Sequence, residues 1–164
     1  MDIRWYPRYR KIPCRLPRGR PSRAGSFLQI HIDVFANAGN PFEDVGYYLH
    51  VEPGNCHAGA GLFIPTKAAL ASLRLRLIDD PKGMREIVQN PEFKEAFPDG
   101  IVTRKALKSV PDGFEQNDPA AKYLKMVGLG CRQDLPDALL LEDDVIGQLT
   151  DIFRLASPLV RYFE

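Results

Sequence analysis

The sequence predicts an α+β fold: an antiparallel sheet of three or more strands, helices packed mainly on one face, and a long C-terminal helix. The period of the apolar residues changes from two to about 3.6 near Thr66, which is typical of strands followed by helices. The connections between the first strands are short, which favours antiparallel pairing. The chain has 164 residues, 45% hydrophobic and 26% charged, enough for one ordinary globular domain with its own core.

The first 25 residues differ in composition from the rest of the chain. Residues 1–23 hold eight Lys and Arg against one acid, Asp2, and residues 1–25 hold four prolines without a sustained apolar period. This pattern predicts an extended, poorly ordered basic arm over residues 1–25, followed by a single α+β domain over residues 26–164.

Targeting signals and cysteines favour a cytoplasmic location. The arm lacks the apolar central region of a secretory signal. Its arginines are typical of a mitochondrial transit peptide, which is the minor alternative. Its prolines, however, disfavour the amphipathic helix that such peptides form. Cys14, Cys56 and Cys131 are odd in number and far apart, so no disulfide framework or CxxC pair is expected. No apolar run is long enough to cross a bilayer, so no membrane partner is expected.

Two segments alternate as strands do. Residues 26–37 place an aliphatic set on one face, and residues 46–65 form a hairpin around the turn at residues 53–55. Alternation predicts that Leu49, Val51 and Leu62 are buried. It also places Tyr48, His50 and Glu52 on the opposite face.

Helices are predicted from Thr66 onward. Thr66, Asp80 and Asn90 are suited to cap helices, and the last two precede a proline at the first helical position. The clearest helix begins after the acidic residues 142–144, and Pro158 should kink or end it.

The segment from residue 46 to residue 164 resembles the conserved hypothetical family called domain of unknown function 2461. The motifs that carry the resemblance occur in order: GYYLHVEP at 46–53, Gly61-Leu62 before Pro65, Leu70…Leu73-Arg74, Phe93…Phe97, Leu107-Lys108…Pro111-Asp112-Gly113-Phe114…Pro119, Leu124-Lys125 and Phe153…Pro158…Phe163. The resemblance implies an α+β fold and no known activity.

The N-terminal part departs from that family. Members carry a long upstream helical region and a basic stretch of the form RxxRDxRFSxDKxPYK, and neither is visible here. The resemblance therefore implies a shortened or differently begun member, and no residue is carried over from the missing region.

The candidate ligand-binding residues are Tyr48, His50, Glu52, Gly59 and Gly61. A histidine and a carboxylate on one strand face are a workable acid–base set, and two glycines on one face of the return strand would leave a flat surface beside them. The alternative is the solvated face of a one-sided sheet.

The three histidines raise the question of a metal. His31, His50 and His57 with Glu52 or Asp33 could form a site, but no recognised ligand spacing is present, and no metal is predicted. The cofactor is unknown.

Three functions stay open. The first is an intracellular binding domain for an unknown ligand or protein, and the second is an enzyme that uses the Tyr48, His50 and Glu52 face. The third is weak, non-specific nucleic-acid binding through the basic arm, where Trp5, Tyr6 and Tyr9 lie among the cations.

Overall fold

The computed structural model describes residues 30–35, as a strand, and residues 45–164. The predicted arm over residues 1–25, and most of the predicted loop between the first two strands, lie outside the described residues. Among the helices described, none is long and apolar enough to span a membrane.

Four antiparallel strands form one sheet in the order β1-β2-β3-β4. The strands are β1 (Ile30–Phe35), β2 (Gly46–Val51), β3 (Cys56–Leu62) and β4 (Leu129–Leu135). The first three form the predicted meander, whereas β4 joins the far edge after a long helical excursion. The α+β prediction is therefore confirmed.

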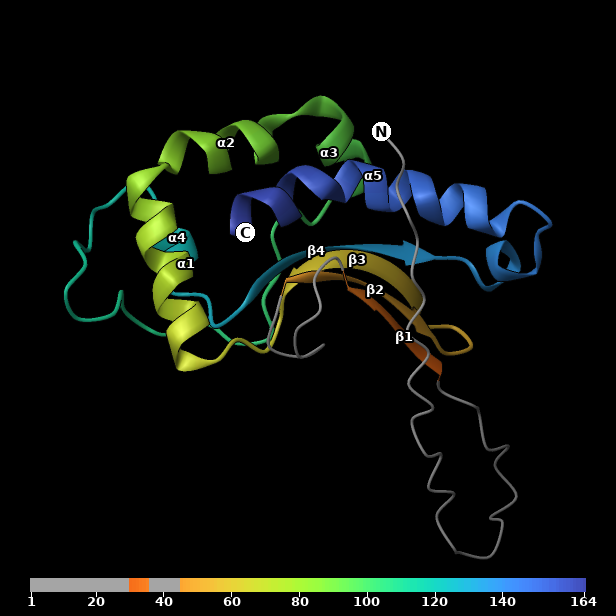
Figure 1. The fold of residues 1–164 in the computed structure, drawn as a ribbon, viewed down its shortest axis with the longest axis horizontal. Coiled ribbons are helices and arrows are strands. Elements are labelled where there is room, and N and C mark those ends of the chain that lie inside the picture. The colour runs from red at the N-terminus through yellow and green to blue at the C-terminus, as the bar shows by residue number, and fades with distance from the viewer. Residues whose placement is uncertain (1–29, 36–44) are drawn as a thin grey trace, which may run out of the picture.

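The helices lie over one side of this sheet or beyond the ends of its strands, as Figure 1 shows. They are α1 (Lys67–Asp79), α2 (Pro81–Gln89), α3 (Pro91–Ala96), α4 (Ala121–Leu124), a 3₁₀ helix η1 (Asp137–Leu141) and the long α5 (Val145–Phe163). The long α5 packs across β3, so the C-terminal helix covers the centre of the sheet.

The three predicted helix starts are confirmed. The Thr66 hydroxyl accepts a hydrogen bond from the amide of Ala69, and the Asp80 carboxylate accepts one from that of Gly83. The Asn90 side-chain oxygen accepts from the amides of both Glu92 and Phe93. These bonds satisfy backbone donors that have no partner within the first helical turn.

The α5 helix continues past Pro158 to Phe163 and does not end at the proline. Proline has no amide hydrogen, so the carbonyl of Arg154 loses its usual partner four residues on. The Ser157 hydroxyl donates to that carbonyl at 2.8 Å, which satisfies it.

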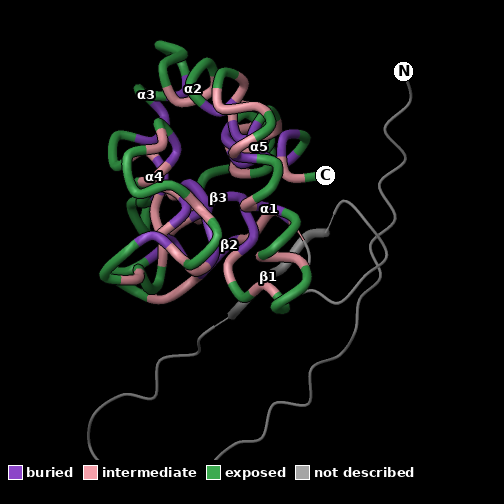
Figure 2. Tube along the Cα trace, turned by 90° about the vertical axis from the view of Figure 1, so that its left-hand side faces the viewer, coloured by how far each residue is buried: buried purple, intermediate pink, exposed green. Residues whose placement is uncertain are grey.

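The core surrounds α5 and includes residues of the sheet and of α1, α2 and α3, and Figure 2 shows buried residues gathered along α5 and β3. Leu49 and Leu62 are buried, and Val51 is half-buried against the core. The Tyr47 ring packs on that of Phe153 at 5.4 Å between centroids. The predicted inner face of β2 is confirmed, and its other face is left to carry polar side chains.

Candidate functional site

The cross-strand register brings most of the predicted site residues together on the outer face of the sheet. Tyr48 of β2 pairs with Gly59 of β3, and His50 pairs with His57. Directly opposed residues in antiparallel strands point to the same face. The outer face of β2 and β3 therefore presents Tyr48 and His50 beside Gly59 and His57.

A hydrogen-bonded pair, His50 and Glu52, lies at the end of this face next to the β2–β3 turn. The Nε2 atom of His50 is 3.2 Å from an Oε2 oxygen of Glu52, and the same oxygen accepts from the side-chain amide of Asn55 at 2.6 Å. Only 8% of His50 is exposed, whereas the Glu52 side chain is 29% exposed. The turn residue Asn55 thus fixes the carboxylate, and the carboxylate orients the histidine ring.

The second histidine, His57, stacks on the first. The two rings lie 4.6 Å apart at an angle of 28°, and Nδ1 of His57 is 3.1 Å from the carbonyl oxygen of Asn55. A carbonyl oxygen only accepts, so Nδ1 carries the hydrogen. Burial is the largest cause that lowers the pKa of His57, which favours its neutral form.

Tyr48 closes the other side of the face. Its ring meets Phe63 edge-on at 4.7 Å, and its hydroxyl donates a long hydrogen bond of 3.5 Å to the carbonyl of Cys131. Burial raises the pKa of Tyr48, so its hydroxyl stays protonated at neutral pH. Tyr48 can donate a hydrogen bond but cannot act as a base.

The glycines allow close packing and do not leave an open floor. A methyl group on Gly59 would collide with the carbonyl oxygen of Cys131 and lie 2.8 Å from the Tyr48 hydroxyl. One on Gly61 would collide with the backbone of Leu129 and Gly130. The surface expected above Gly59 is therefore occupied by the tyrosine, a packing of ring on glycine that stabilises sheets.

Two charged residues that the sequence did not suggest complete the face. Arg132 of β4 pairs with Gly59, and Asp134 pairs with His57, while their side chains form a salt bridge of 3.0 Å. The alternation of Leu129, Cys131 and Leu135 with polar neighbours was the only signal for this strand. That pattern is too short to predict a strand by itself.

Within residues 45–164, no group of three or more His, Cys, Asp or Glu side chains is arranged to hold a metal ion. The register of β1 places His31 opposite His50 and Asp33 opposite Tyr48. The side chains of that strand are not described.

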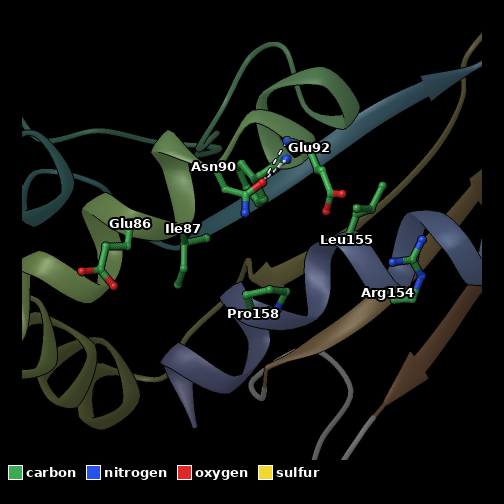
Figure 3. Close-up of a pocket in the computed structure, with 8 residues that line it drawn as sticks. Glu86, Ile87, Asn90, Glu92, Arg154, Leu155 and Pro158 are labelled. Atoms are coloured by element: carbon green, nitrogen blue, oxygen red, sulfur yellow. Dashed lines mark hydrogen bonds between the residues drawn. The ribbon is translucent and has the colours of Figure 1, made fainter.

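In the described part of the chain, hollows lie elsewhere, between helices. A groove of about 400 Å³ runs between α2, α3 and α5 (Figure 3). A smaller one of about 230 Å³ lies between α2 and the segment that leads into α4. Neither is lined by Tyr48, His50 or Glu52.

Comparison with known proteins gives one match. The family model described as "Conserved hypothetical protein (DUF2461)" matches residues 26–162, which adds the β1 region to the part that carries the sequence motifs. No curated protein and no solved structure matches the chain. Because the family model covers most of the chain, this protein belongs to the conserved hypothetical family DUF2461.

Proposed function

We propose that this protein is a binding protein of the cytoplasm and that its ligand surface is the outer sheet face around Tyr48, His50 and Glu52. The observation that carries the proposal is the His50–Glu52 hydrogen bond of 3.2 Å. Asn55 holds the Glu52 carboxylate by a second hydrogen bond, and the His57 ring stacks on that of His50. A nearly buried histidine and an oriented carboxylate among aromatic rings are the convergent polar groups that ligand sites use.

The ligand that suits this face is a small polar molecule. Glu52 and Asp134 offer acceptors, and Arg132 offers donors in a planar fork. The rings of Tyr48 and His57, 5.7 Å apart and nearly perpendicular, offer apolar contact. Gly59 and Gly61 contribute by letting Tyr48 and β4 approach, not by direct contact.

The test is a screen of small polar compounds by thermal shift, followed by titration calorimetry on variants. His50→Gln keeps a polar side chain of similar reach and should weaken a true ligand at least about tenfold, the loss expected when one charged or buried hydrogen bond is removed. Lys94→Gln, on the exposed part of α3, should leave the affinity unchanged. Equal affinities in wild type and His50→Gln would remove the proposal.

A second candidate, acid–base catalysis, is favoured by the same pair. A carboxylate that fixes the tautomer of a histidine is the arrangement that general-base catalysis requires. The protonated Tyr48 leaves the histidine as the base and the tyrosine as a donor. Turnover of any substrate that is lost in His50→Gln and retained in Lys94→Gln would favour the enzyme over the binding protein.

A third candidate is weak nucleic-acid association through residues 1–25, which lie outside the described residues. It is supported by the eight cations in residues 1–23 and the three aromatic residues Trp5, Tyr6 and Tyr9 among them.

A further inference from the structure

The groove between α2, α3 and α5 is an open hollow large enough to hold a small molecule. Its volume of about 400 Å³ falls within the range of small-molecule sites. Four lining residues are apolar and four are polar or charged: Ile87, Phe93, Leu155 and Pro158, with Glu86, Asn90, Glu92 and Arg154.

One wall of the groove is fixed by the corner at Asn90. Asn90 ends α2 and caps α3, and Pro91 begins the new helix. The Asn90 side-chain oxygen accepts from the amides of Glu92 and Phe93 at 2.8 and 3.2 Å, as the dashed lines in Figure 3 show. The corner therefore holds Glu86 and Glu92 at opposite ends of the groove (Figure 3).

The other wall contains a proline inside a helix. A proline in a helix interior removes a backbone hydrogen bond and crowds the preceding turn. Pro158 is exposed and adds little to the core, yet its ring and Leu155 form the apolar surface that faces α2 and α3. Pro158 therefore contributes to the groove surface more than to the core.

Charge decides which ligand fits. The lining holds two carboxylates, Glu86 and Glu92, against one cation, Arg154. Arg154 already pairs with Asp151 at 3.3 Å on the same helix. The Glu92 carboxylate, at the end of the groove beside Leu155, therefore favours a cation over a ligand that carries a carboxylate.

We propose that this groove binds a small amphipathic cation, a protonated amine on an apolar body, with the amine at Glu92 and the apolar body on Leu155 and Pro158. In Figure 3 the Glu92 side chain extends from α3 toward Leu155, which places the carboxylate beside the apolar surface. The site is separate from the outer sheet face and does not depend on the function proposed there.

The experiment uses tryptamine as the cationic probe, with indole-3-acetate as the anionic control on the same ring. Binding to the full chain is followed by backbone NMR and titration. Tryptamine should shift the amides of Ile87, Phe93 and Leu155 saturably, and indole-3-acetate should bind at least about tenfold more weakly, as the loss of one charge-assisted contact implies. Added salt should weaken tryptamine binding.

Two variants complete the test. Glu92→Gln should weaken tryptamine about tenfold, whereas Glu95→Gln, on the same helix but outside the lining, should not change its affinity. The proposal is overturned if tryptamine does not bind saturably, if it shifts other residues only, if both probes bind equally, or if Glu92→Gln binds like wild type. A lysine-containing peptide is titrated in the same way. If the peptide shifts the groove amides and tryptamine does not, the groove binds a protein partner, and the proposal is overturned.

Discussion

At the scale of single residues, Gly59 shows how the outer face is built. The residue has no side chain, and the space above it holds the Tyr48 hydroxyl and the carbonyl of Cys131. Its small size is therefore needed where two strands and a ring approach one another.

Gly59→Ala should destabilise the fold by about 1–3 kcal/mol, the usual cost of overpacking a filled space. Urea unfolding, followed by fluorescence, measures this change. Ala71→Ser, on the exposed side of α1, is the control and should stay within about 0.5 kcal/mol of wild type. A Gly59→Ala protein as stable as wild type would show that the Tyr48 ring can move aside at little cost.

His57 makes stability depend on pH. Burial, the largest cause, lowers its pKa in the folded state, so the unfolded chain binds a proton more readily. With an unfolded pKa of about 6.5, this contribution is fully present above pH 6.5 and is lost as the pH falls toward the lower folded pKa.

We expect the urea midpoint of wild type to fall between pH 7 and pH 5.5, and the fall to be smaller in His57→Gln. Because His57 is half-buried, the effect is screened by solvent and should be modest. All other effects of pH are common to both proteins, and the difference between the two profiles isolates His57. Parallel profiles would contradict the direction of this pKa shift.

At the scale of elements, the sequence predicts local structure better than long-range pairing. The starts of α1, α2 and α3 were predictable because Thr66, Asp80 and Asn90 act within three residues of themselves. The β4 strand was not predicted, because its hydrogen bonds join it to residues about 70 positions earlier in β3. Nothing local requires the segment LGCRQDL to be extended.

The same distinction applies to the candidate site. Alternation predicts Tyr48, His50 and Glu52 on one face; the register places Tyr48 and His50 there, and Glu52 follows the end of β2. The packing of Tyr48 above Gly59, and the arrival of Arg132 and Asp134, depend on the position of β4. These features need the tertiary fold and could not be read from the strand alone.

The corner between α2 and α3 allows a test at this scale. Asn90→Ala removes two capping hydrogen bonds and should cost about 0.5–2 kcal/mol. The measurement is the free energy of unfolding in urea. Asn90→Asp, which keeps an acceptor oxygen at the cap, should retain most of the stability. If both variants were equally destabilised, capping would not be the reason for the asparagine.

At the scale of the whole molecule, the charge is unevenly distributed. Residues 1–23 carry a net charge of +7 (eight Lys and Arg minus one acid), and the remaining residues carry −6 (fourteen Lys and Arg minus twenty acids). The acidic remainder would repel a polyanion, while the basic segment would attract one.

We therefore predict weak, sequence-independent binding of single-stranded DNA, with dissociation constants of about 10⁻⁴ to 10⁻⁶ M at physiological salt. A fluorescence titration at several salt concentrations should show affinity that falls as salt rises. Deleting residues 1–25 should remove the binding. A flat salt dependence, or binding that survives the deletion, would place the contact on other residues and contradict the prediction.

The central claim is that the face of Tyr48, His50 and Glu52 binds a ligand and is not simply the solvated side of a sheet. Chemical-shift mapping of a library of small polar compounds on the full chain tests it most directly. We predict saturable shifts concentrated at residues 48–52 and 132–134, and their loss in His50→Gln. A library whose hits all fall on other residues, or that gives no saturable hit on this face, would contradict the claim.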